Sequence, residues 1–205
     1  PARQQTLSDT IRWSYDLLEP MHQRLFRTLG VFQDGWNLDA AEAVIEDTSS
    51  DASVLAGLEA LIAHNLVRMH EQEDGEPRYT MLETIAEFAR EQLEATDETL
   101  GASERHAKHF LNVARHAKPH LTGADQSHWM ALLKQDHANL RGAIQWLNTR
   151  AERGDAGAVV ASFEIAESIW WFWHVQGFMR EAQQYCTILL RLLSGNQAAI
   201  QAVTG

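Results

Sequence analysis

The sequence is poor in cysteine, in lysine and in long apolar runs. Its one cysteine, Cys186, excludes an intramolecular disulfide and a cysteine cluster around a metal ion. No apolar run reaches the roughly 18 residues that a membrane-spanning helix needs, and no basic-then-apolar leader opens the sequence. These absences predict a chain that makes no contact with a membrane, and they favour a cytoplasmic location.

Lysine is absent from the first hundred residues, where the charge is strongly negative. Residues 1–100 hold seven arginines against twenty acidic residues, a net charge of −13, whereas residues 101–205 hold ten basic and eight acidic residues, a net charge of +2. An acidic surface repels the phosphates of nucleic acid. The first half is therefore predicted not to bind DNA.

The motifs of common enzyme classes are absent too. The sequence has no Gly-x4-Gly-Lys-Ser/Thr loop, no Gly-x-Ser-x-Gly and no His-Glu-x-x-His. A phosphate cradle needs successive backbone N–H groups and a lysine. We therefore expect no catalytic residue, no bound metal and no cofactor in this chain.

The first half changes from helical to strand periodicity and back again. Predicted helices cover 7–18, 21–32, 37–45, 54–64 and 82–95, and predicted strands cover 66–70 and 78–81. The positions expected to face inward are Leu25, Phe26, Leu29, Phe32, Leu55, Leu58, Leu61, Ile62, Ile85, Phe88, Ala89 and Leu93. Helices, a hairpin and a further helix follow the order of a winged-helix domain, which is predicted over residues 1–96.

The second half is predicted to be entirely helical. Residues 97–102 lack periodicity and mark the predicted domain boundary; helices follow over 103–120, 125–150, 159–176, 178–193 and 196–203. The pair broken at Gly177 resembles a tetratricopeptide-type unit, with Trp171 and Ala182 near its large and small positions. Such arrays need about three units, so residues 103–205 are interpreted as the start of a superhelix in a longer protein.

Three segments, taken together, resemble one protein family. They are TIRWSYDLL (10–18), RYTMLETIAEFA (78–89) and KQDHANLR (134–141). Their order is similar to the winged-helix arm and following helices of signal-transduction ATPases with numerous domains (STAND proteins). This class includes LuxR-type and antibiotic-regulator proteins of bacteria and, more distantly, the NB-ARC proteins of the apoptosome and plant resistance. The resemblance extends over residues 4–193.

The resemblance implies a regulatory module of a bacterial transcriptional regulator that does not itself catalyse. In this family the winged-helix arm senses a nucleotide that a separate core binds and hydrolyses. ATP or ADP, with Mg, would then be held by a nucleotide-binding domain upstream of this chain, and that domain would be a partner in cis. An inducer or a partner protein would bind to the helical repeats.

Met81, Leu82 and Glu83 stand where the family's nucleotide-sensing motif is expected. The plant and animal relatives have Met-His-Asp there, and their histidine contacts the ADP phosphate. Leu82 departs from that pattern because its side chain has no hydrogen-bond donor. The alternative interpretation is that Leu82 packs in the core and that Glu83 is an acid favoured by the helix dipole.

The helix predicted over 54–64 would be the one that reads DNA in a DNA-binding winged helix. It contains no Arg, Lys, Asn or Gln, and the wing over 71–76 is acidic. Base reading and phosphate anchoring both lack their usual side chains.

The segment from Trp170 to His174 holds more aromatic rings than one helical face can bury. Consecutive helical residues point about 100° apart, so at least one of Trp170, Trp171 and Trp173 should face a groove or a partner. These tryptophans and His174 are therefore candidate partner-binding residues. The alternative is that they seal the contact between helix pairs.

Four histidines, His106, His109, His116 and His120, recur at helical spacing. The last two could ligate a metal ion at i,i+4, but no carboxylate pair joins them, and solvated surface histidines are the favoured interpretation. Two other functions stay open for the whole chain: a free-standing scaffold that binds peptides, and a DNA-binding winged helix. A P-loop upstream of Pro1 would favour the regulatory module of an ATPase over the free-standing scaffold.

Overall fold

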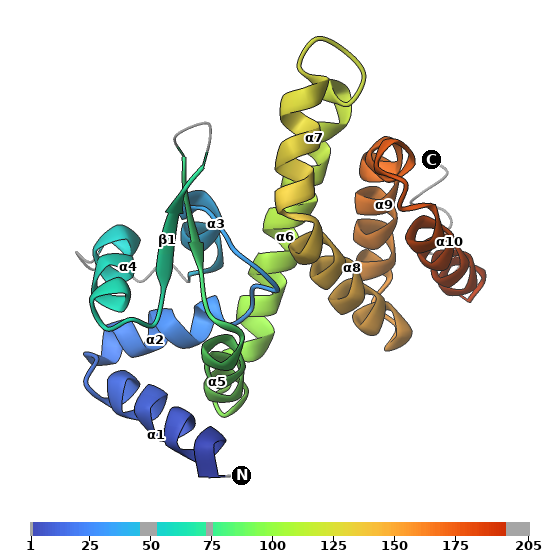
Figure 1. The fold of residues 1–205 in the computed structure, drawn as a ribbon. Coiled ribbons are helices and arrows are strands. Elements are labelled where there is room, and N and C mark those ends of the chain that lie inside the picture. The colour runs from blue at the N-terminus through green and yellow to red at the C-terminus, as the bar shows by residue number, and fades with distance from the viewer. Residues whose placement is uncertain (1, 46–52, 73–75, 196–205) are drawn as a thin grey trace. The chain divides into compact units, whose positions relative to one another are not determined.

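The computed structural model describes residues 2–45, 53–72 and 76–195, and the chain divides into two compact units (Figure 1). The first unit covers Pro1–His106 and the second covers Ala107–Gly205. The described chain is mostly helical with one small hairpin, which confirms the predicted fold class. Among the described residues, none of the helices combines the length and the apolar character that crossing a membrane demands.

The first unit has the element order of a winged-helix domain. Its elements are α1 (Ala2–Asp16), α2 (Pro20–Leu29), α3 (Leu38–Val44), α4 (Val54–Ala63), β1 (Arg68–Glu71), β2 (Pro77–Thr80), α5 (Glu83–Glu94) and the beginning of α6 (Thr99–Ala117). Local signals explain where two of these helices begin. The side chain of Asn37 accepts a hydrogen bond from the N–H of Ala40 at 2.9 Å, and Pro20 occupies the first turn of α2.

The hairpin is extended by one residue from outside it. β1 and β2 pair antiparallel, with Met69 opposite Tyr79. The Trp36 N–H donates to the Tyr79 carbonyl at 2.9 Å, and the Tyr79 N–H donates to the Trp36 carbonyl at 2.8 Å. Trp36 is buried and stacks on Phe32 with the ring centroids 5.1 Å apart. A single bridging residue has no periodicity, so the sequence offered no signal for this contact.

An aromatic cluster forms the centre of the first unit. The ring of Phe26 lies 5.4 Å from Tyr15 and 6.2 Å from Phe88, which itself lies 5.6 Å from Tyr15. These rings come from α1, α2 and α5, so the cluster joins three helices. The predicted inward positions of the second and last helices of this unit are buried and thereby confirmed: Leu25, Phe26, Leu29, Phe32, Ile85, Phe88, Ala89 and Leu93.

The predicted inward stripe of helix α4 is confirmed only in part. Leu58 and Leu61 are buried as expected, but Leu55 is 42% exposed. The helix packs on α2 through Gly57, where a Cβ atom would lie 2.4 Å from Cδ2 of Leu25. This close approach at a glycine turns the helix so that Leu55 points outward. The apolar stripe alone did not reveal that Gly57 is at the contact.

The second unit is a succession of helices. They are the remainder of α6, a 3-10 turn (Lys118–His120), α7 (Gln126–Gln135), α8 (His137–Glu152), α9 (Ala156–Gln176) and α10 (Met179–Ser194). The single helix predicted over 125–150 is wrong, because the chain breaks at Asp136 between α7 and α8. Residues 99–102 are helical rather than irregular, because α6 begins at Thr99. The helix predicted over 196–203 lies outside the described residues.

Three consecutive helices, α8, α9 and α10, pack side by side (Figure 1). A buried hydrogen bond from Ser162 Oγ to Asn148 Oδ1, 2.7 Å long, joins α9 to α8. Gly177 ends α9 in the left-handed conformation at φ 78°, as its predicted position between two helices requires. The following N–H, from Phe178, donates to the Trp173 carbonyl at 2.9 Å and closes the turn into α10.

Candidate functional site

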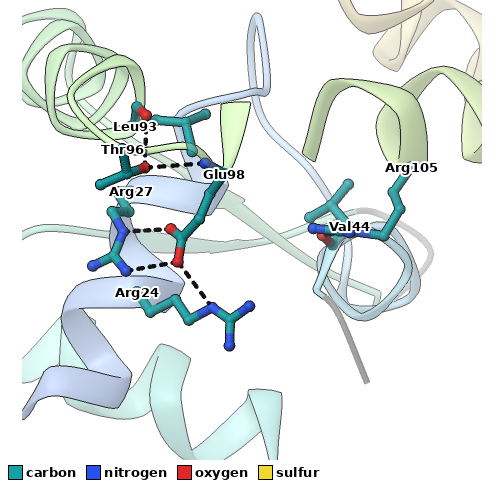
Figure 2. A network of polar contacts seen from close by, with 7 residues as sticks. All are labelled: Arg24, Arg27, Val44, Leu93, Thr96, Glu98 and Arg105. Atoms are coloured by element: carbon teal, nitrogen blue, oxygen red, sulfur yellow. Dashed lines mark hydrogen bonds and ion pairs between the residues drawn. The ribbon is translucent and has the colours of Figure 1, made fainter. Parts of the chain in front are cut away.

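A polar network holds the end of the winged helix in place (Figure 2). Glu98 accepts two hydrogen bonds from Arg27, at 2.6 and 2.9 Å, and lies 3.2 Å from Nε of Arg24. Further along, Arg105 donates to the Val44 carbonyl at 2.7 Å, at the end of α3. The segment that leads into α6 is therefore held against α2, and the beginning of α6 itself is held against the end of α3, within the first unit. Sequence periodicity cannot detect such a network, because its members are 71 residues apart.

The Arg27 hydrogen bonds, with further help from the Arg24 charge, hold the pKa of Glu98 below its usual value of 4.5. Replacing Glu98 with glutamine should lower the free energy of unfolding at neutral pH by about 1–2 kcal/mol. A lowered folded-state pKa stabilises the fold above the unfolded-state pKa, and this contribution disappears as the pH falls through the folded-state value. The difference in the free energy of unfolding between wild type and variant should thus shrink below pH about 4.5 in denaturant titrations.

A matched Glu94→Gln variant, at an exposed position, should show no such trend. A difference for Glu98→Gln that does not change with pH would contradict the ion pair.

Met81, Leu82 and Glu83, the predicted sensor residues, form the junction between β2 and α5. Leu82 is the N-cap residue of α5, and its carbonyl accepts hydrogen bonds from Ile85 and Ala86, both at 2.8 Å. Its side chain is 44% exposed, so the interpretation of Leu82 as a core residue is wrong. Met81 is half-buried and Glu83 is exposed. The junction thus offers an outward apolar group beside a carboxylate.

The outward side of α4 carries no positive charge. Its exposed residues are Leu55, Ala56, Glu59 and Ala63. In the wing, Glu71 and Glu76 are exposed, while residues 73–75 lie outside the described ranges. The neighbouring strand β1 does expose Arg68 and His70, although His70 is hydrogen-bonded to Thr80 Oγ1 at 3.1 Å. A phosphate backbone would meet few cations on this surface.

The aromatic segment of α9 divides into an exposed and a buried part. Trp170 is 47% and Trp171 37% exposed, as predicted for at least one tryptophan of this segment, and His174 is exposed too. The partner-binding assignment of Trp173 is wrong, since this residue is 1% exposed and stacks on Tyr185 of α10 at 5.6 Å. Trp173 belongs to the face of α9 that α10 covers, and periodicity could not tell which faces of this apolar helix were covered.

We define the aromatic shelf as Trp170, Trp171 and His174. The His174 ring stacks against both indoles, 6.0 Å from Trp170 and 5.1 Å from Trp171. Beside the shelf lies an open pocket of about 330 Å³, lined by Trp170, Met179, Arg180, Ala182, Gln183 and Cys186. The sequence marked Ala182 only as a small position of the helix pair and predicted no partner-binding residue on α10, because α9 and α10 form the pocket together.

The four spaced histidines pack against aromatic rings or form a hydrogen bond. His106 is buried with its ring 5.4 Å from Phe32, and His109 packs edge-on against Phe110 at 4.9 Å. The ring of His116 hydrogen-bonds the Asn112 carbonyl at 2.8 Å, and His120 stacks on Trp129 at 4.9 Å. Across the described ranges, no group of three His, Cys, Asp or Glu side chains is arranged to hold a metal ion.

Comparison with known proteins agrees with the fold of the first unit. Residues 18–94 match the winged helix-turn-helix domain family. The chain is 31% identical over 191 residues to proteins of Mycobacterium bovis and Mycobacterium tuberculosis, each named "Putative HTH-type transcriptional regulator". The match covers 92% of this chain and 20% of those proteins.

A second mycobacterial protein of both species, named as uncharacterized, is 30% identical over 108 residues, which are 52% of this chain and 28% of that protein. No solved structure matches the chain significantly. The chain spans about a fifth of the length of the first relatives. Residues 18–94 are thus a winged helix-turn-helix domain, in a chain homologous to these mycobacterial proteins.

Proposed function

We propose that this chain is a regulatory, non-catalytic module of a bacterial signal-transduction ATPase that controls transcription. The names of the mycobacterial relatives support a role in regulation. In this proposal the winged helix contacts protein and not DNA. It packs on a nucleotide-binding core that lies outside the chain, and that core holds ATP or ADP with Mg. The helical unit binds an inducer or a partner protein.

One observation carries the protein-contacting role of the winged helix. The side of α4 that would enter a DNA groove exposes Leu55, Ala56, Glu59 and Ala63. Winged helices that read DNA place arginine, lysine or amide side chains at such positions. Apolar groups around one carboxylate suit a protein surface instead, and the net charge of −13 over residues 1–100 acts against phosphate at longer range.

The β2–α5 junction supports a contact with the nucleotide-binding core. Leu82 points outward from the position of the family's sensing residue, and Glu83 stands beside it in the first turn of α5. An exposed leucine contributes binding free energy when its apolar surface becomes buried against another domain. We infer that Leu82 replaces direct phosphate sensing by an apolar domain contact.

A DNA-binding winged helix is the second candidate function. The domain match over residues 18–94 and the relatives' names favour it, and Arg68 is an exposed cation on β1. Arg68 begins β1 opposite Thr80, three residues before the wing starts at Glu71, and a phosphate contact could form there. The two functions differ in what Arg68 should do.

Fluorescence anisotropy with a labelled DNA duplex of mixed sequence separates the two functions. At about 150 mM salt, we expect no saturable binding by the whole chain at concentrations up to roughly 100 µM. The Arg68→Ala variant should behave like wild type. Sequence-selective binding below about 1 µM, weakened by Arg68→Ala, would overturn the protein-contacting role and establish the DNA-binding one.

A further inference from the structure

The pocket beside the aromatic shelf carries a positive charge and no negative one. Its lining contains one cation, Arg180, and no carboxylate. Arg180 is exposed and makes no ion pair with any residue in the described part of the chain. A guanidinium in this setting presents its planar set of donors to an incoming carboxylate.

The acidic residues close to the shelf in sequence are already paired. Glu181 accepts a hydrogen bond from Nε2 of His137 at 2.8 Å, and both side chains are largely buried. On α9, Glu164 pairs with Arg115, and Glu167 pairs with Lys118 at 2.6 Å. These pairs leave the charge of Arg180 uncompensated at the pocket, so the pocket is complementary to a negative group.

The apolar part of the surface is large and held in place. Trp170 and Met179 line the pocket while nearly half exposed, and Trp171 continues the surface along α9. His174 stacks on both indoles, so the rings lose little freedom when another side chain packs on them. Exposed tryptophans beside an arginine are the residue types that dominate binding energy in protein interfaces.

We propose that this pocket binds an acidic, apolar peptide segment of a partner protein. An apolar side chain of the segment packs on Trp170 and Met179, and a neighbouring carboxylate pairs with Arg180. The amide of Gln183 lies on the same wall and can hydrogen-bond the segment. This inference deepens the proposed function and rests on its partner-binding role for the helical unit.

A single-stranded nucleic acid would also stack on exposed tryptophans, but it needs a groove of cations that follows its backbone. The pocket offers Arg180 alone. The peptide is therefore the occupant that the charges favour, and nucleic acid becomes an outcome of the test.

Cys186 provides a direct readout of occupancy. It is the sole cysteine of the sequence, it is exposed, and it lines the pocket. The rate at which a maleimide alkylates Cys186 should therefore fall when a peptide fills the pocket. The probe is an amphipathic peptide of about four helical turns with Leu and Phe on one face and Glu on the other. The control peptide carries Lys in place of every Glu.

We expect the acidic peptide at saturation to slow alkylation of the whole chain by about fivefold or more, and the lysine peptide to leave it unchanged. Arg180→Glu should lower the affinity of the chain for the acidic peptide by roughly tenfold and raise its affinity for the lysine peptide. Trp170→Ala should lower the affinity for the acidic peptide while leaving the melting temperature of the chain unchanged. Arg153→Glu alters an exposed arginine outside the pocket and should change neither affinity.

Equal protection by the two peptides, or acidic-peptide affinity that Arg180→Glu does not change, would overturn the proposal. Stronger protection by an oligothymidylate than by the acidic peptide would overturn it in favour of nucleic acid. These results concern the second unit alone, whereas the anisotropy experiment concerns α4 and β1. If the acidic peptide does not protect Cys186 and the chain does not bind DNA, the peptide-binding role of the pocket is wrong, whereas the protein-contacting role of the winged helix is unaffected.

Discussion

Replacing Trp173 with alanine should lower the free energy of unfolding by about 3–5 kcal/mol. The residue is 1% exposed and stacks on Tyr185 of α10, so the change leaves a large cavity where α9 and α10 meet. Burial of Tyr185 itself raises the pKa of its hydroxyl to about 12. Urea titration followed by circular dichroism measures the loss. This is among the largest effects expected for a single substitution in the second unit.

The matched control is Trp171→Ala, two positions away on the same helix. Trp171 is 37% exposed, so its removal should change the free energy of unfolding by less than about 1 kcal/mol. Similar losses for both variants would contradict the division of this segment into a buried and an exposed part. The pair of measurements therefore distinguishes the buried Trp173 of the structure from the partner-binding Trp173 that the sequence predicts.

Substituting Gly30 with alanine should destabilise the first unit by about 2–3 kcal/mol. A Cβ atom at Gly30 would lie 2.8 Å from the carbonyl carbon of Ala89 and 2.9 Å from the backbone nitrogen of Arg90. Backbone atoms of α5 cannot rotate away as a side chain can, so α2 and α5 would have to separate. Backbone strain is not the cause, because φ at Gly30 is −61°.

Gly123→Ala is the control for this substitution. A Cβ atom at Gly123 would meet no described atom within 4 Å, so the expected change is within about 0.5 kcal/mol of zero. Thermal unfolding of both variants, followed by circular dichroism, provides the comparison. A Gly30→Ala variant as stable as wild type would show that α2 and α5 are farther apart than the structure places them.

Much of the winged helix could be predicted from local sequence patterns. The stripe of Ile85, Phe88, Ala89 and Leu93 is buried as expected, because α5 is covered on one side and its polar residues occupy the other. The hairpin was predictable because its strands break the helical period around an acidic loop. The turn at Gly177 was predictable because a helix end commonly requires a left-handed residue.

The helical unit was harder to predict, for a physical reason that α9 illustrates. This helix is apolar on most of its circumference, and it packs between α8 and α10. Periodicity identifies which residues share a face, but it does not reveal how many faces neighbouring helices cover. Trp170, Trp171 and Trp173 were therefore indistinguishable in sequence, although two are exposed and one is buried.

The sequence by itself determined the element types, the buried stripes of α2 and α5 and the acidic character of the first half, because propensity, periodicity and charge are local properties. Only the tertiary structure decided that Leu55 and Leu82 point outward, that Glu98 reaches Arg27, and that Arg180 stands beside Trp170. Each of these outcomes depends on contacts between residues distant in the chain or on different helices. A close approach such as Gly57 against Leu25 sets the rotation of a helix, and that rotation selects which side chains remain available for a partner.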